Sequence, residues 1–178
     1  MTDNPVYDLT SLESSPERYL YLFRSNNDGL KLVVHQLIEI RENRKVFNLG
    51  FGHWDEERES LIDDEVYNGM DGRMVLNTVL ATIPLFFRNC PNDSLLIQGS
   101  DSRDDFSEKC RISCIKNCKE ECKKQHQRIR IYCNYLDKHF KELVKVYIFF
   151  GMIETETSDF EQYVPGTFYT SVLIYKKK

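Results

Sequence analysis

Four cysteines recur at every fourth position in the middle of the chain, a spacing that predicts metal-binding or redox chemistry. They are Cys110, Cys114, Cys118 and Cys122. Because four residues advance an α-helix by about 400°, these thiols would form a stripe on one broad face. Neighbouring thiols one turn apart can bind a soft metal ion such as zinc, and His126, Cys90 or Cys133 would complete a tetrahedral set. The metal site predicted from this pattern comprises Cys110, Cys114, Cys118, Cys122 and His126.

The geometry of a straight helix limits that prediction. The first and last thiols would lie about 18 Å apart, so one ion could not bind all four. A helical hairpin that breaks near Lys119 and Glu120 would bring the two pairs together and make a zinc site credible. The alternative, which we favour, is that cysteine serves as a small apolar residue in a helix–helix seam near Phe106, Ile115 and Ile129.

A Gly-Ser turn before the cysteine segment predicts an anion-binding site. Gly99 and Ser100 lie where a strand is expected to lead into a helix, and backbone N–H groups at a helix start attract anions. The candidate residues are Gly99, Ser100, Arg103, Arg128, Arg130 and Tyr132. The alternative, again favoured, is a capped helix in which Ser100 or Asp101 is the cap. The carboxylates at positions 104 and 105 would also repel a phosphate.

Nothing in the sequence predicts a catalytic centre. There is no Ser-His-Asp order, no phosphate-binding loop and no His-Glu-x-x-His motif. His35 and His53 fall in strand patterns without a nearby nucleophile, so we expect packed or surface histidines and not catalytic bases. We therefore assign no catalytic residue.

The charge of the chain is uneven along its length. The net charge is −4, but residues 103–130 hold nine Lys and Arg against five Asp and Glu, which makes that segment +4 and leaves −8 for the rest. A basic element on an acidic body favours docking to a protein partner, or to a second copy of the chain, over binding of nucleic acid. The alternative, which the charges support equally, is a helix face that is simply solvated.

Composition predicts a folded cytoplasmic protein. The chain is 41% hydrophobic, contains no apolar run long enough to cross a membrane, and begins with a polar, acidic segment and not with a signal peptide. The six cysteines are then expected to be free thiols in a reducing compartment. No cofactor is expected, unless the cysteines bind zinc.

Hydrophobic periodicity predicts the elements that must position these residues. Alternation indicates three strands joined by tight turns, at residues 19–23, 30–41 and 47–54. In the second strand, Leu32 and Val34 belong to the apolar side and Lys31 and His35 to the other side. A helix capped by Asp71 follows, with Pro84 expected to kink it or to shorten its last turns.

The second half of the chain repeats the alternation of strands and helices. We expect a short strand at 95–97, a polar helical stretch to about 126, a helix at 129–143, and strands at 146–150 and 168–175. The order βββ-α-β-α-α-β-β predicts an α+β fold with a largely antiparallel sheet and helices mainly on one face. Residues 1–18 are predicted to be an extended arm, and residues 19–178 a single domain with a Cys-rich helical insertion at 101–127.

Several motifs together resemble one protein family. They are Asn48-Leu49-Gly50-Phe51-Gly52, Asp63-Asp64, Val75-Leu76 with Thr78-Val79, Ile97-Gln98-Gly99-Ser100, Tyr147-Ile148-Phe149-Phe150-Gly151 and Val172-Leu173-Ile174-Tyr175-Lys176-Lys177. From about Tyr19 onward the chain resembles an uncharacterised family of small bacterial proteins. In that family an Arg-x-Arg-aliphatic-Tyr run follows the Gly-Ser turn closely. Here the similar run, at 128–132, is displaced by some two dozen residues, so the Cys-rich segment resembles an insertion.

The resemblance implies a fold and a compartment but no established activity. We therefore expect a non-enzymatic bacterial interaction protein that contacts a partner through its basic, Cys-striped helix. One alternative is a zinc-binding module organised by the cysteines. Another is an enzyme that acts on an anionic substrate near the Gly-Ser turn.

Overall fold

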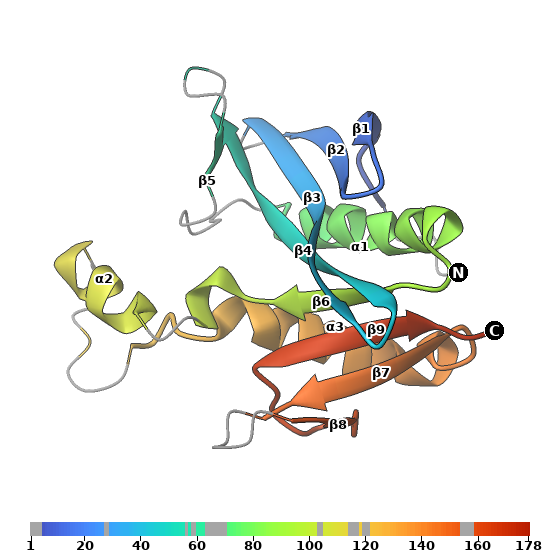
Figure 1. Ribbon diagram of the computed structural model, residues 1–178. Helices are drawn as coiled ribbons and strands as arrows, with labels where there is room; N and C mark the ends of the chain where they lie inside the picture. Colours follow the sequence, from blue (N-terminus) through green and yellow to red (C-terminus); the bar gives the residue numbers. More distant parts are fainter. Residues whose placement is uncertain are drawn as a thin grey trace. The chain divides into compact units, whose positions relative to one another are not determined.

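The structure is a computed structural model of the chain. It describes residues 5–26, 29–55, 57, 60–62, 71–102, 105–113, 118, 122–153 and 159–178. The chain divides into two compact units, Met1–Leu95 and Leu96–Lys178, each built from helices and antiparallel strands (Figure 1). This confirms the predicted α+β class. Within the described residues, no helix combines the length and the apolar character that crossing a membrane requires.

The first unit contains the predicted meander of three long strands. These are β2 (Arg18–Ser25), β3 (Gly29–Arg41) and β4 (Arg44–Asp55), and each pairs antiparallel with the next. Two short strands that the sequence pattern did not predict extend the meander. β1 (Thr10–Ser14) pairs with β2, and β5 (Ser60–Ile62) pairs with β4. The segment predicted to be an arm therefore contains a strand.

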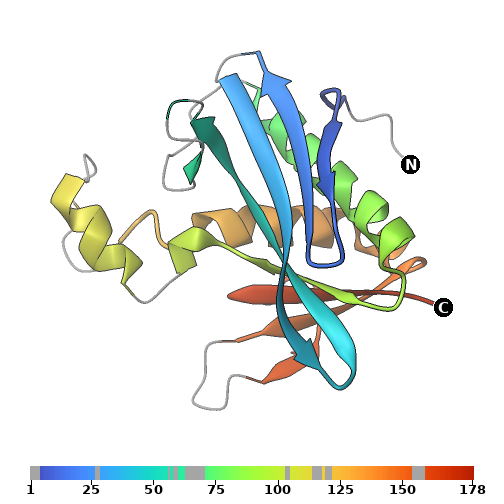
Figure 2. The same cartoon turned by 45° about the horizontal axis from the view of Figure 1, so that its top comes forward.

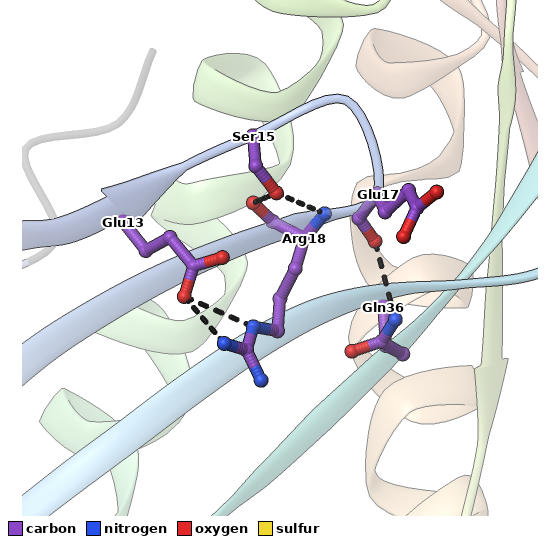
Figure 3. A network of polar contacts seen from close by, with 5 residues as sticks. All are labelled: Glu13, Ser15, Glu17, Arg18 and Gln36. Carbon is purple, nitrogen blue, oxygen red and sulfur yellow. Dashed lines mark hydrogen bonds and ion pairs between the residues drawn. The ribbon is translucent and has the colours of Figure 1, made fainter.

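A network of polar contacts fixes the turn between β1 and β2 (Figure 3). Arg18 donates two hydrogen bonds, of 3.0 and 2.7 Å, to one carboxylate oxygen of Glu13. The hydroxyl of Ser15 accepts from the backbone N–H of Arg18 at 3.0 Å. On the next strand, Gln36 donates from its side-chain amide to the carbonyl of Glu17 at 3.3 Å. The turn is thus joined both to its own hairpin and to β3.

One long helix, α1 (Gly72–Asn89), packs on one face of this meander (Figure 2). The Phe86 ring contacts Tyr19 of β2 and Phe47 of β4 edge-on, at centroid distances of 6.1 and 5.0 Å. Of the two effects predicted for Pro84, a shortened helix is wrong, because α1 continues to Asn89; a kink stays a prediction. Proline removes only one helical hydrogen bond, and the burial of Phe86 and Phe87 holds the last turn in place.

The face of β3 that the sequence pattern assigns to polar residues is the face that α1 covers. Lys31, Val33 and His35 are all buried there. The imidazole of His35 lies 3.0 Å from the hydroxyl of Thr82 on α1, so this histidine is packed between the strand and the helix. Both faces of this part of β3 are buried, and strict alternation of apolar and polar residues therefore does not describe it.

The second unit is built on three antiparallel strands and one long helix. β7 (Tyr147–Met152) pairs with both β8 (Phe160–Gln162) and β9 (Ser171–Lys176). The helix α3 (Gln127–Leu143) buries the predicted stripe, including Ile129, Cys133 and Leu136. β6 (Ser94–Gln98) confirms the strand expected at 95–97 and spans the boundary between the units.

The sequence predicts one helical stretch to about residue 126, but in the structure the residues just before α3 form a turn. The described part begins with a single 3₁₀ turn, η1 (Ser100–Ser102), and a short helix, α2 (Phe106–Ser113). Residues 123–126 form a turn, and His126 has a left-handed backbone with φ of 59°. This conformation ends any helix that approaches α3 from before it. Figures 1 and 2 both show α2 beyond η1, away from the β7–β9 strands of the same unit.

Candidate functional site

The Gly-Ser junction is organised around the side chain of Asp101, which folds back over Gly99. A Cβ atom on Gly99 would overlap one carboxylate oxygen of Asp101. The same position lies 3.2 Å from the hydroxyl of Ser102 and 3.3 Å from the Cβ of Arg128. Glycine is required here because three side chains meet above its α-carbon. Asp101 is only 5% exposed.

Asp101 caps α3, a helix that begins 26 residues later in the chain. Its Oδ2 accepts a hydrogen bond of 2.8 Å from the backbone N–H of Arg128, and its carbonyl accepts one of 3.1 Å from the N–H of His126. The first turn of α3 contains no acidic residue of its own. Asp101 therefore supplies the negative charge that favours a helix N-terminus. We expected it to cap its own helix, so the capping role is retained but the capped helix is different.

The structure brings together part of the predicted anion-binding set. The guanidinium of Arg128 donates a hydrogen bond of 2.8 Å to the hydroxyl of Ser100, and the Cβ of Arg128 lies on the side of Gly99 where a side chain would stand. Desolvation raises the pKa of Tyr132 to about 12, and the charges of Arg128 and Asp101 act on the same phenol. Arg103 lies outside the described residues. The carboxylate of Asp101 already occupies the start of α3, so it neutralises the positive end of that helix.

Three polar atoms at this junction are buried without a hydrogen-bond partner among the residues that the structure describes. They are Oδ1 of Asp101, Oγ of Ser102 and Nδ1 of His126. Buried polar atoms of this kind are commonly satisfied by an ordered water. Chemically, the junction is therefore a small hydrogen-bonding centre that holds η1 and α3 together.

Arg130 lies apart from this centre, against an aromatic ring. Its guanidinium carbon is 5.1 Å from the centroid of the Phe168 ring, within the range of a cation–π contact. The imidazole of His126 meets the same ring edge-on at 5.6 Å. Phe168 was expected to begin the last strand, but β9 begins at Ser171 and Phe168 lies before it, 43% exposed. The sequence analysis did not identify Phe168 as a surface residue.

The predicted metal-binding residues lie in different local environments. Cys110 is half-buried in α2, and Cys122 is buried just before the turn that leads to α3. The sulfur of Cys118 accepts a hydrogen bond of 3.4 Å from the backbone N–H of Lys123. Cys114 lies outside the described residues. Among the residues that the structure does describe, no three His, Cys, Asp or Glu side chains form a metal-binding group.

The two other cysteines belong to separate cores. Cys90 lies at the end of α1, with its sulfur 3.2 Å from the hydroxyl of Tyr19. Cys133 is buried on α3. Burial raises the pKa of both thiols. These positions fit the structural interpretation of cysteine as a small apolar residue.

The first unit contains two sets of polar contacts that the sequence analysis did not predict. Lys31 is 3% exposed, and its ammonium lies 3.5 Å from Nδ1 of His53 on the neighbouring strand. Near the start of α1, the hydroxyl of Tyr7 donates to the carboxylate of Asp71, and the backbone N–H of Tyr7 donates to Thr78 at 2.8 Å. The register of β3 and β4 places Lys31 opposite His53. No local sequence pattern predicts these contacts. Strand pairing creates the first, and the path of residues 5–7 against α1 creates the second.

The N-terminal part of this α+β chain matches a known protein family. The chain belongs to DUF6934, a family of unknown function, whose family model matches residues 3–110. The match includes the whole meander, α1 and the Gly-Ser junction, and it ends at Cys110 within α2. No curated protein and no solved structure matches the chain.

Proposed function

We propose that this protein is a non-enzymatic binding protein that contacts a protein partner through its basic segment, residues 103–130. The support is physical. Nine basic residues in this segment stand against five acidic ones in a chain that is otherwise acidic. Lys123, Lys124 and Arg130 make no ion pair in the part of the chain that the structure describes.

One observation carries the proposal: Ile112 of α2 is 88% exposed. α2 is only eight residues long, so it needs contacts beyond its own helical bonds to persist. Within the unit, Ser107 of α2 donates a hydrogen bond of 2.8 Å to the side chain of Gln125. The outer residues of the helix, Arg111 and Ile112, are left exposed. An exposed apolar side chain among cations is suited to a partner that is itself acidic and partly apolar.

A crosslinking experiment tests the proposal. A photoreactive amino acid at position 112 should capture a defined partner in cells that naturally make the protein. The same group at Lys138, an exposed lysine of α3, is the control. Capture should disappear when Lys123 and Lys124 are both changed to Glu. Equal capture from both positions, or capture that survives the charge reversal, would contradict the proposal.

We further propose that the protein works in the bacterial cytoplasm. The five cysteines that the structure describes are all free thiols, which suits a reducing compartment. Labelling of the protein inside intact cells with a membrane-permeant thiol reagent, compared with an impermeant one, tests this. Labelling by the impermeant reagent would place the thiols outside the cytoplasm.

A second candidate function is zinc binding, favoured by the sulfur of Cys118. The backbone N–H of Lys123 donates to this sulfur at 3.4 Å, and contacts of this kind orient the ligands of a metal ion. Elemental analysis of protein purified without chelator should then find about one zinc per chain. The metal should be lost in the double variant Cys118→Ser, Cys122→Ser and kept in Cys90→Ser. Metal content that does not change between these variants would exclude the candidate.

A further inference from the structure

The second unit presents basic residues near an exposed aromatic ring. Arg130 and His126 contact the ring of Phe168, and Lys123 and Lys124 precede His126 in the same turn of the chain. We call these five residues the basic-aromatic surface. We infer that it binds an acidic protein segment that carries an apolar side chain beside its carboxylates. The inference rests on the proposed function and names the chemistry of the partner.

The geometry of α3 builds the centre of this surface. The N–H of Arg130 donates to the carbonyl of His126 at 3.1 Å, so the two side chains are one helical turn apart and share a face. Both contact the ring of Phe168, Arg130 over its face at 5.1 Å and His126 edge-on at 5.6 Å. Lys124 precedes His126 by two residues in the same turn. One guanidinium, one imidazole and one aromatic ring are thereby held within reach of a single ligand segment.

Both sides of the surface are fixed before any partner arrives. His126 is held by the bond from its N–H to the carbonyl of Asp101, which also caps α3. Phe168 lies between two backbone hydrogen bonds, from Thr167 to Val164 at 3.2 Å and from Thr170 to Met152 at 2.8 Å. A surface that is ordered in advance loses little conformational entropy on binding.

The charges of the surface favour an anionic partner. Among the described residues, Lys123, Lys124 and Arg130 make no ion pair, so each can pair with an anionic group of a ligand. A carboxylate can bind the guanidinium of Arg130 through two parallel hydrogen bonds. An apolar side chain next to that carboxylate would cover the exposed part of Phe168, which is 43% exposed.

Two features favour an acidic protein segment over nucleic acid. Outside residues 103–130 the chain carries a net charge of −8, which repels a long polyanion. The guanidinium of Arg130 already covers one face of the Phe168 ring, where a base would otherwise stack. A short acidic segment with a single apolar residue is repelled less than a long polyanion and does not need to stack on the covered face of Phe168.

Peptide binding to the full chain tests the inference. The probes are a fluorescent glutamate-rich peptide with one central leucine, the same peptide with serine in place of leucine, and a single-stranded oligothymidine. The leucine peptide should bind most tightly, and its affinity should fall about tenfold in Arg130→Gln and in Phe168→Ala. Binding should weaken as salt rises, since the contact is electrostatic. Lys138→Gln, which removes an exposed cation elsewhere on α3, should leave the affinity unchanged.

The variants keep the test decisive. Arg130 and Phe168 are exposed, so their loss should leave the fold intact, which circular dichroism checks. Arg130→Lys keeps the charge but loses the paired hydrogen bonds, and should retain part of the affinity. Equal binding of the leucine and serine peptides, tighter binding of oligothymidine, or self-association without peptide binding would each overturn the inference. If crosslinking at Ile112 still identifies a partner whose capture is insensitive to Arg130→Gln and Phe168→Ala, this inference fails while the proposed function stands.

Discussion

Gly99 shows how a single missing side chain can position several others. The α-hydrogen of this glycine faces Asp101, Ser102 and Arg128, and a methyl group would occupy the space that their atoms fill. The cap of α3 depends on this close approach, because Asp101 can reach Arg128 only by folding over Gly99. A glycine at a turn is thus part of the capping of a distant helix.

Replacement of Gly99 by Ala should therefore destabilise the protein. The new Cβ would displace the carboxylate of Asp101, and we expect a loss of about 1–3 kcal/mol in the free energy of unfolding, measured by urea denaturation. Gly50→Ala is the matched control, since its Cβ would make only ordinary contacts, 3.8 Å from Val34. Equal stability of the Gly99 variant and the wild type would show that Asp101 does not need this space.

His35 links the stability of the first unit to pH. Burial lowers its pKa from 6.5 to about 3. Between these values the unfolded chain binds a proton that the native protein excludes, so stability is retained above pH 6.5 and is lost as the pH falls toward 3. The slope should reach about 1.4 kcal/mol per pH unit within this window.

Unfolding by urea at neutral pH and at mildly acidic pH measures this effect. The variant His35→Gln should lower the slope, whereas His53→Gln, in a half-exposed environment, should keep it. Should His35→Gln fail to fold, nuclear magnetic resonance of the wild-type imidazole provides the answer. A signal that titrates near pH 6.5 would contradict the burial of His35.

At the scale of elements, the strands of the second unit depend on one close contact. A Cβ on Gly151 of β7 would overlap the ring of Tyr169, which is fully buried. The hydroxyl of Tyr169 accepts from the N–H of Val164 at 3.1 Å, and its ring meets that of Tyr163 at 4.9 Å. Tyr169 therefore ties the segment before β9 to both β7 and β8.

Gly151→Ala should be strongly destabilising for this reason. We expect a loss of about 2–4 kcal/mol, because neither the backbone of β7 nor a buried ring can move far. A double-mutant cycle with Tyr169→Leu provides the control. In the Tyr169→Leu background the alanine should cost clearly less, and additive effects of the two substitutions would contradict the contact.

Asp137 supports the same region from α3. Its carboxylate accepts hydrogen bonds from the hydroxyl of Tyr163 at 2.7 Å and from the N–H of Gly166 at 3.1 Å. Burial, with the bond to Asp137, raises the pKa of Tyr163 well above its ordinary value. One carboxylate therefore holds both the residue after β8 and the following turn against the helix.

The cysteines should differ in reactivity according to their elements. Cys110 and Cys118 are half-buried, whereas Cys90 and Cys133 are buried and burial raises the pKa of both thiols. Because the thiolate is the reactive form, Cys110 and Cys118 should be alkylated well before Cys90 and Cys133. Mass spectrometry after brief treatment with iodoacetamide measures the order. Treatment with a chelator beforehand controls for protection of the thiols by zinc. Rapid alkylation of Cys133 would contradict its burial in the core.

For the whole molecule, the sequence predicts a single domain over residues 19–178, whereas the fold has two compact units. Cooperative unfolding distinguishes one domain from two independent ones. The only tryptophan, Trp54, lies on β4 and reports on the first unit, while Gly151 lies in the second.

If the chain unfolds as a single domain, Gly151→Ala should lower the one unfolding transition, whichever probe follows it. The midpoint followed by Trp54 fluorescence should shift by the same amount as the midpoint followed by circular dichroism. The wild-type protein, followed by both probes, is the control. If the Trp54 transition stays at its wild-type position, the two units unfold independently and the prediction is wrong.

The sequence by itself determined the elements whose signals are local. Alternation predicted β2, β3 and β4, and a period of 3.6 predicted α1 and α3, because burial of one face imposes these patterns on neighbouring residues. The α+β class followed from their order. The Gly-Ser turn was also recognised as a junction of strand and helix, and the structure places Ser100 against Arg128 there.

Only the tertiary structure decided which partners these elements found. β1, β5 and β8 are too short to show a periodic pattern, and they are strands because a neighbouring strand pairs with them. The burial of His35 depends on α1. The cap that Asp101 provides joins residues 27 positions apart, and Phe168 meets Arg130 through the turn before β9. Contacts between residues distant in sequence leave no periodic signal, because their energy depends on where the chain returns and not on which residue comes next.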